Sequence, residues 1–245
     1  MHVRTSPARP ARSVALTALL ALLAALTLAG CSGSDSSSGS SDDPAAALAA
    51  AKKALDDTSG VHLEITSENV PADTTALLGA SGDGTHAPAF DGQIKVAFSG
   101  LEPTVPVIAV DGKVYAQVPL SPGWQTIDPK EFGAPDPSTL LAKDGGFSSL
   151  LTATTGPTKG EQVRGGEDNK EVLTTYTGTI DQTAAKTILP GATGDFDVTY
   201  TIGEGDQLRT MKVVGDFYGK GSDTTYTIAF SDYGSNPTIT APDTK

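Results

Sequence analysis

The pattern of hydrophobic and polar positions changes near residue 60. Before it, an alanine-rich stretch follows Asp43 and Pro44, a pair typical of a helix start in which Asp is the N-cap and Pro occupies the first turn. From residue 61 onward, apolar and polar residues alternate, which is the period of a strand with one buried face. We therefore expect a helix over 44–57 and strands beyond it.

Alternation of this kind, or a strong turn signal, marks the strands that we expect. Asp111-Gly112 supplies the positive φ angles that a tight type I′ hairpin requires, so the apolar runs on either side of it should pair. Residues 69–91 contain three glycines, two prolines and several aspartates, and we expect a loop or a weak edge hairpin there. The predicted strands are 61–66, 94–99, 105–110, 113–118, 160–163, 172–180, 196–202, 208–217 and 225–230.

Short helices interrupt the predicted strands. Asp136-Pro137 repeats the helix-start pair, and Gly145-Gly146 divides the apolar positions that follow, which predicts two short helices between 137 and 151. Another is expected over 181–189. Because the order of elements has no β-α-β rhythm, the expected fold class is α+β, with an antiparallel sheet. One face of this sheet should be polar and solvated, and the other apolar and covered by the short helices.

The N-terminus has the pattern of a targeting segment. Three arginines and no acid precede the apolar run 14–28, whose fifteen residues would span about 22 Å as a helix, less than the ~30 Å hydrocarbon layer. Leu28-Ala-Gly-Cys31 follows and resembles the lipobox of bacterial lipoproteins, in which the cysteine receives a diacylglyceryl group. We expect a lipoprotein signal peptide over 1–30 and lipidation at Cys31; the alternative is a buried or free thiol that stands there by coincidence.

The residues after the predicted cleavage site divide into a tether and one domain. Residues 31–43 hold the lipidated cysteine and a flexible Ser/Gly/Asp stretch with a reach of about 20 Å, and 44–245 form a single domain. Removal of residues 1–30 takes away three arginines, which lowers the formal net charge from −12 to −15. Such a chain is not attracted to anionic headgroups, so membrane residence would depend on the covalent acyl chains.

Composition narrows the class of protein further. Of the 245 residues, 38% are hydrophobic and 19% are charged, proportions that exclude a collagen, a coiled coil or a wholly disordered chain. The 29 acidic residues outnumber the 17 basic ones, so we expect no nucleic-acid partner. The lone cysteine excludes an internal disulfide.

The sequence offers no catalytic constellation. His62 falls on the outward face of a predicted strand with no nucleophile expected beside it, and His86 falls in a loop. Nucleophile-elbow, nucleotide-loop and zinc-helix motifs are all missing from the sequence. The acids of 167–171 lack the spacing of a calcium loop. We therefore expect no enzyme activity, no metal and no cofactor.

An ordered set of segments resembles a known family, the actinobacterial lipoproteins that include LppX, LprA, LprF and LprG. None of these segments is specific alone, but together they follow the family's order over nearly the whole chain after the lipobox. They are the lipobox itself, the alanine-rich first helix, 93–100, 110–116 with Trp124 soon after, 136–141, 172–180, 227–233 and 238–242.

The resemblance implies a highly curved antiparallel sheet, a half-barrel, with short helices over its concave face and a hydrophobic cavity for acyl chains between them. Alternation alone does not separate such a cavity from a packed core. Trp124 could lie over the cavity mouth or cap the sheet edge, and Tyr115 could be a rim contact or an exposed strand residue. A cavity would be lined by Ile94, Val96 and Phe98, joined by some of Val61, Leu63, Ile65, Val198, Tyr200, Ile202, Ile228 and Phe230.

Two functions remain in view. The first is a membrane-tethered extracytoplasmic lipoprotein that binds acyl chains of lipids or glycolipids and carries them across or within the cell envelope. Its partners would be that lipid, the membrane through the covalent anchor, and an envelope transporter, and we expect a monomer. The alternative is a cell-envelope scaffold or interaction module without lipid cargo.

Overall fold

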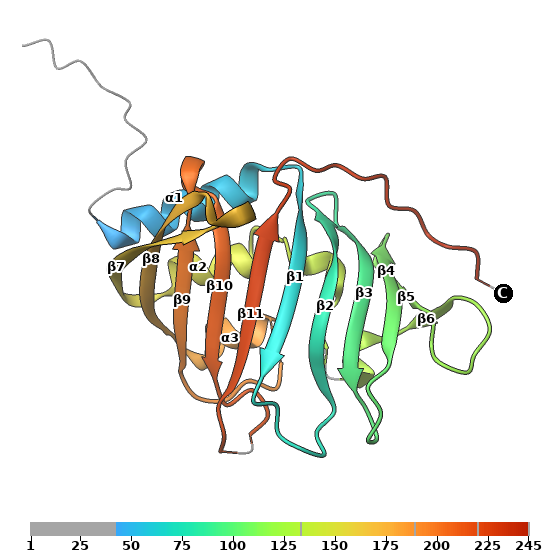
Figure 1. The fold of residues 1–245 in the computed structure, drawn as a ribbon. Coiled ribbons are helices and arrows are strands. Elements are labelled where there is room, and N and C mark those ends of the chain that lie inside the picture. The colour runs from blue at the N-terminus through green and yellow to red at the C-terminus, as the bar shows by residue number, and fades with distance from the viewer. Residues whose placement is uncertain (1–42, 133, 189, 220, 245) are drawn as a thin grey trace, which may run out of the picture. The chain divides into compact units, whose positions relative to one another are not determined.

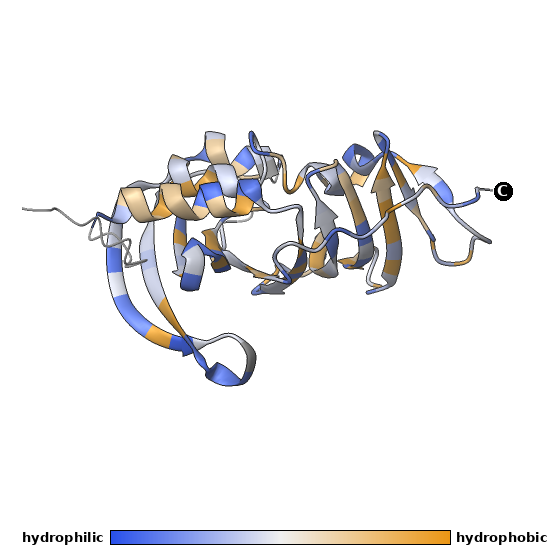
Figure 2. Cartoon of the chain, turned by 90° about the horizontal axis from the view of Figure 1, so that it is seen from above, coloured by the Kyte–Doolittle hydropathy of each residue, from blue (hydrophilic) through white to orange (hydrophobic). Residues whose placement is uncertain are grey.

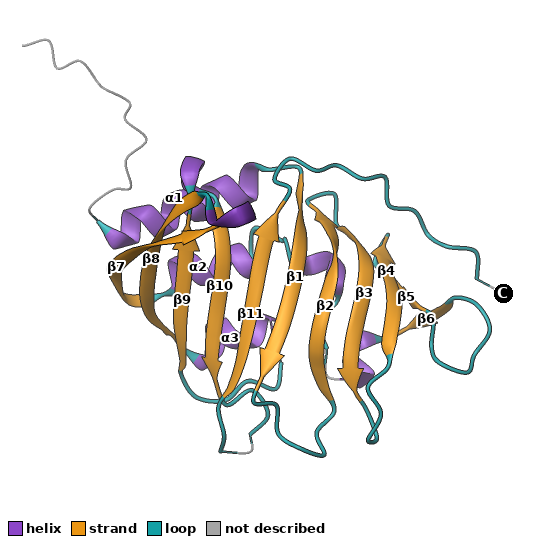
Figure 3. Ribbon diagram, in the orientation of Figure 1, coloured by secondary structure: helices purple, strands orange, loops and turns teal. Residues whose placement is uncertain are grey.

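The computed structural model describes residues 43–132, 134–188, 190–219 and 221–244, which all belong to one compact unit with its own hydrophobic core. The predicted signal peptide and Cys31 lie outside the described residues. This part of the chain is built on one open, curved sheet (Figures 1 and 3). Its strands are β1 (Gly60–Glu68), β2 (Ala76–Thr85), β3 (Ala89–Ala97), β4 (Thr104–Val110), β5 (Lys113–Ala116), β6 (Gln125–Ile127), β7 (Thr155–Gly165), β8 (Glu171–Ile180), β9 (Phe196–Ile202), β10 (Leu208–Gly215) and β11 (Thr224–Ser231).

Two meanders make up this sheet. Strands β1 to β6 follow one another on one side, β7 to β11 follow one another on the other side, and the pairing of β1 with β11 joins the two. The strand order is therefore β6-β5-β4-β3-β2-β1-β11-β10-β9-β8-β7, with every neighbouring pair antiparallel. The predicted α+β class with an antiparallel sheet is confirmed.

The α-helices lie along one face of the sheet, which we call the helix face, and the hairpin of β7 and β8 projects from the opposite, outer face (Figure 2). The first helix begins where the sequence predicts, because the Asp43 carboxylate accepts a hydrogen bond from Ala45 N at 3.0 Å and Pro44 occupies the first turn. The helical elements are α1 (Pro44–Asp57), η1 (Pro129–Phe132), η2 (Pro137–Thr139), α2 (Phe147–Ala153), η3 (Glu167–Asn169), α3 (Gln182–Ile188) and η4 (Glu204–Asp206).

The stretch expected as a loop or weak edge hairpin, 69–91, contains the interior strand β2, which pairs with β1 and β3. The small residues of β2 make this strand hard to recognise in the sequence. Packing against a neighbouring aromatic ring explains why a glycine is needed there. A Cβ added at Gly82 would lie 2.7 Å from the ring of Phe90, and one added at Gly92, its partner on β3, would lie 2.8 Å from the same ring. The Phe90 ring thus occupies the space that side chains on both glycines would need.

The outer face is only partly solvated. The Asp111-Gly112 turn has the predicted positive φ angles of 55° and 68°, and the β4–β5 hairpin places Tyr115 on the outer face. There Tyr115 is buried with Ala89 and Val110, while Trp124 and Ile239 pack against them. Trp124 therefore belongs to a small outer cluster that the C-terminal segment covers, and not to a cavity mouth.

Candidate functional site: an apolar cavity on the helix face

A cavity of about 480 Å³ lies between the helix face of the sheet and the elements that cover it. Its walls come from the strands β1–β6, β8, β10 and β11, from α2 and α3, and from the loops around η1 and η2 and after β10. Among the described residues, its lining includes no charged side chain and three polar ones, namely Thr75, Tyr218 and Tyr226. Such a space can accept hydrocarbon but offers little to a charged ligand.

Strand register explains where the side chains on the sheet, which forms the floor of the cavity, leave room for it. Across the sheet, Ile228 pairs with Ile65, Ile65 with Ala80, and Ala80 with Ile94, so these four side chains form one row on the helix face. All four border the cavity. Because Ala80 ends at Cβ, the row has a gap between the two larger isoleucine side chains, Ile65 and Ile94.

The structure divides the eleven side chains predicted to line a cavity into two groups. Six border the cavity, which are Leu63, Ile65, Ile94, Val96, Phe98 and Ile228. Five are buried in the packed core and do not border it, which are Val61, Val198, Tyr200, Ile202 and Phe230.

Helix placement separates these groups. Phe230 meets the ring of Phe147 on α2 edge-on, with 5.9 Å between ring centroids, and the Tyr200 hydroxyl lies 2.8 Å from Thr154 Oγ1 at the end of the same helix. α1 and α2 contact each other, and α1 contacts β10 and β7, so this half of the sheet is covered by full helices. Strands β3 and β4 contact the short η2 on this face, and the cavity remains there.

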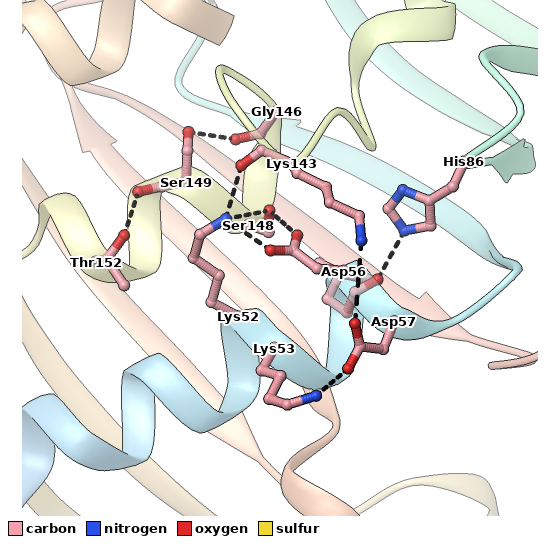
Figure 4. Close-up of polar contacts among 11 residues, drawn as sticks. Lys52, Lys53, Asp56, Asp57, His86, Lys143, Gly146, Ser148, Ser149 and Thr152 are labelled. Atoms are coloured by element: carbon pink, nitrogen blue, oxygen red, sulfur yellow. Dashed lines mark hydrogen bonds and ion pairs between the residues drawn. The ribbon is translucent and has the colours of Figure 1, made fainter.

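A polar contact set holds α1 against the start of α2 (Figure 4). The Lys52 ammonium lies 2.8 Å from Asp56 Oδ2 and donates to the carbonyl oxygen of Lys143 at 2.7 Å. Asp56 in turn accepts a hydrogen bond from Ser148 Oγ at 2.6 Å. Nearby, His86 Nε2 donates to the carbonyl oxygen of Leu55 at 2.8 Å. These bonds hold α2, which lines part of the cavity, against α1.

Comparison with protein-family models identifies the family of this chain. The family model described as LppX_LprAFG lipoprotein matches residues 43–239. The chain belongs to this family. A comparison with curated protein sequences finds no match.

Two solved structures share the fold of this LppX_LprAFG lipoprotein. LprF from Mycobacterium bovis is 20% identical with a TM-score of 0.67, over 81% of this chain and 96% of that one. The lipoprotein LppX from Mycobacterium tuberculosis is 18% identical with a TM-score of 0.59, over 80% of this chain and 97% of that one. Among the described residues, no helix combines the length and apolar character needed to cross a bilayer.

Two of the three polar side chains in the cavity wall of this family member are tyrosines that contact each other. The Tyr226 hydroxyl donates to the carbonyl oxygen of Leu77 at 2.7 Å, so its single proton is used there, and the adjoining Tyr218 hydroxyl donates to Tyr226. Both protons are then engaged, and the oxygens keep acceptor capacity. Burial raises the pKa of both phenols above the usual value, so both stay neutral at physiological pH.

A second polar cluster lies on the outer face. His62 Nδ1 lies 2.8 Å from Asp83 Oδ1, and His62 Nε2 lies 3.2 Å from Ser81 Oγ. The expectation that no nucleophile stands beside His62 was wrong, because Ser81 and Asp83 belong to β2, the strand hidden within 69–91. Cross-strand neighbours are invisible to sequence reasoning when the partner strand is not recognised.

The order of these contacts matches that of a Ser–His–Asp triad, but acyl transfer also needs N–H donors aimed at a developing oxyanion. The β1 and β2 strands are each paired on both sides, so their backbone N–H groups are engaged in the sheet. The three side chains stand on the open outer surface and do not border the cavity. Among the described residues, no three His, Cys, Asp or Glu side chains are grouped to hold a metal.

Proposed function

We propose that this family member is a membrane-tethered extracytoplasmic lipoprotein that binds the acyl chains of lipids or glycolipids and carries them across or within the cell envelope. The observation that carries the proposal is the cavity of about 480 Å³, whose described lining holds no charge and three polar side chains. Membership of a lipoprotein family supports the same function. We propose a binding protein and not an enzyme.

The free energy of burial favours long chains over small apolar molecules. Each CH₂ removed from water contributes about 0.8 kcal/mol, so a chain of about sixteen carbons contributes roughly 13 kcal/mol. Association costs an estimated 4–15 kcal/mol in lost freedom of motion. A lipid chain therefore offsets more of that cost than a short apolar compound does. The uncharged wall thus favours longer chains, and a charged headgroup would remain at the mouth or outside.

The tether is the second part of the proposal. A diacylglyceryl group on Cys31 would hold the domain at the outer face of the membrane, and 32–43 would give it a reach of about 20 Å. This distance keeps the cavity near the layer from which lipid would be loaded. Delivery to an envelope transporter and a monomeric state belong to the same proposal.

Lipid uptake by a soluble form comprising residues 32–245 tests the binding function. Ile94 is half-buried on the cavity floor, so Ile94→Trp should lower the affinity for a fluorescent long-chain lipid at least tenfold while the protein stays folded by circular dichroism. Val163→Trp, at an exposed position on the β7 edge strand, is the matched control and should bind as the wild type does. A folded wild type that takes up no lipid would favour the scaffold without cargo.

A further inference from the structure

Exposed apolar side chains gather around the mouth of the cavity. Among the described residues, seven large hydrophobic side chains are exposed, and five of them also border the cavity. We call these five the mouth rim. They come from the β3–β4 hairpin, the loop between β5 and β6, and η1, all on the β6 side of the sheet (Figure 1). The mouth rim consists of Phe98, Leu101, Val118, Leu120 and Phe132.

The rim side chains hold their outward positions at some cost. Leu101 is 68% exposed, and Leu120 is fully exposed. Leu120 also has a φ of 68°, in the left-handed region that disfavours residues with a Cβ. Exposure of these apolar side chains to water is unfavourable, and a cluster of this kind is typical of a surface that contacts another apolar surface.

Charged side chains near the rim include two pairs of opposite sign, and none of the described charged side chains lines the cavity. Lys95 and Glu102, at the base of the β3–β4 hairpin, form an ion pair with 2.7 Å between Nζ and Oε2. Within η1, Lys130 stands next to Glu131, so this element adds no net charge. Because the rim residues are themselves part of the cavity lining, the apolar wall continues from inside the cavity to the outermost of them.

Continuity with a lipid cavity points to a bilayer as the partner of the rim. We propose that the mouth rim inserts into the outer surface of a lipid bilayer, so that acyl chains pass between bilayer and cavity without crossing water. This inference rests on the proposed function. A second copy of this chain fits less well, because two molecules that each carry a net charge of −15 over residues 32–245 repel each other.

The acidity of the chain also sets the kind of membrane. A protein held by basic residues prefers anionic lipids, whereas this chain should prefer a zwitterionic surface, where only the apolar contact acts. Binding should therefore be stronger on phosphatidylcholine than on its equimolar mixture with phosphatidylglycerol. Added salt should reduce that difference by screening the repulsion.

Vesicle flotation of the soluble form, residues 32–245, tests the rim. We expect binding to phosphatidylcholine vesicles, lowered about tenfold or more when Leu101 and Leu120 are both replaced by serine. The control replaces Val163 and Val172 by serine; these are 41% and 48% exposed on β7 and β8, away from the mouth. Control binding should equal that of the wild type.

The outcomes separate the rim from the cavity. Uptake of a water-soluble short-chain fluorescent lipid by the wild type, measured without vesicles, tests the cavity separately from the rim. Normal uptake by a wild type that does not bind vesicles would overturn the rim proposal and leave the proposed function standing. Equal vesicle binding by rim and control variants would also overturn it, as would a dimer that the rim substitutions convert to monomers. Absence of both uptake and vesicle binding would overturn both proposals.

Discussion

Ala80 on β2 and Ile94 on β3 lie opposite each other on the helix face, and both border the cavity. The small side chain beside the large one leaves the floor low at this point. The same row continues to Ile65 on β1, so the gap is flanked on both sides by isoleucine. The small side chain at one position of this apolar row thus leaves room for the cavity.

Filling that gap should remove lipid binding. Ala80→Phe places a ring in the cavity, and we expect at least a tenfold loss of affinity for long-chain lipid. Overpacking costs about 1–3 kcal/mol in a full core, but here the free energy of unfolding should fall by less, because the ring enters empty space. Ser81→Phe, one residue along and on the outer face, is the control and should bind lipid normally. Wild-type affinity in Ala80→Phe would show that ligands do not use the floor.

The glycines of β2 should be required for stability. A Cβ at Gly82 would lie 2.5 Å from the carbonyl oxygen of Asp91, a backbone atom that cannot move aside. We expect Gly82→Ala to lower the free energy of unfolding by at least about 2 kcal/mol, measured by urea denaturation. At Gly160 on the edge strand, the nearest atom to an added Cβ is 3.4 Å away, so Gly160→Ala should change stability by less than about 0.5 kcal/mol. Equal effects at both sites would contradict the packing described for Phe90.

Alkaline pH should unfold the protein through its buried tyrosines. Burial is the largest cause that raises the pKa values of Tyr200, Tyr226 and Tyr233 above the ordinary value. Each phenol ionises more easily unfolded than folded, so stability is fully present below pH ~10 and is lost above it, by up to about 1.4 kcal/mol per pH unit for each group. Urea midpoints should fall steeply above pH ~10. Three phenolates titrating near pH 10 in a protein still folded by circular dichroism would contradict this.

The His62 cluster should have no esterase activity. Without free N–H donors for an oxyanion, the contact with Ser81 Oγ is a surface hydrogen bond. We expect p-nitrophenyl ester hydrolysis by the wild type to equal that of Ser81→Ala and His62→Ala. A rate that both substitutions abolish would revive an enzyme on the outer face.

Local signals in the sequence were enough for elements that encode their own boundaries. Asp43-Pro44 sets the start of α1, and Asp111-Gly112 sets the β4–β5 turn. The β2 strand was missed because its identity depends on its neighbours, since Gly82 and Gly92 face each other under one Phe90 ring. A local sequence pattern does not indicate which strand will lie beside it.

Alternation likewise could not separate cavity from core. Ile228 and Phe230 stand two residues apart on the same face of β11, yet Ile228 borders the cavity while Phe230 packs against Phe147. The difference depends on where α2 covers the sheet, a tertiary fact. Lipidation at Cys31 lies outside the described residues and stays a prediction from the lipobox.

Native mass spectrometry of residues 32–245, purified without detergent from a bacterial host, tests the lipid-binding claim most directly. We predict a species heavier than the bare chain by the mass of a lipid, which fragments to release acyl chains. Ala80→Phe, prepared in parallel, should show the bare chain alone. A wild type found only as the bare chain, and still bare after incubation with phospholipid and glycolipid, would contradict the proposed function.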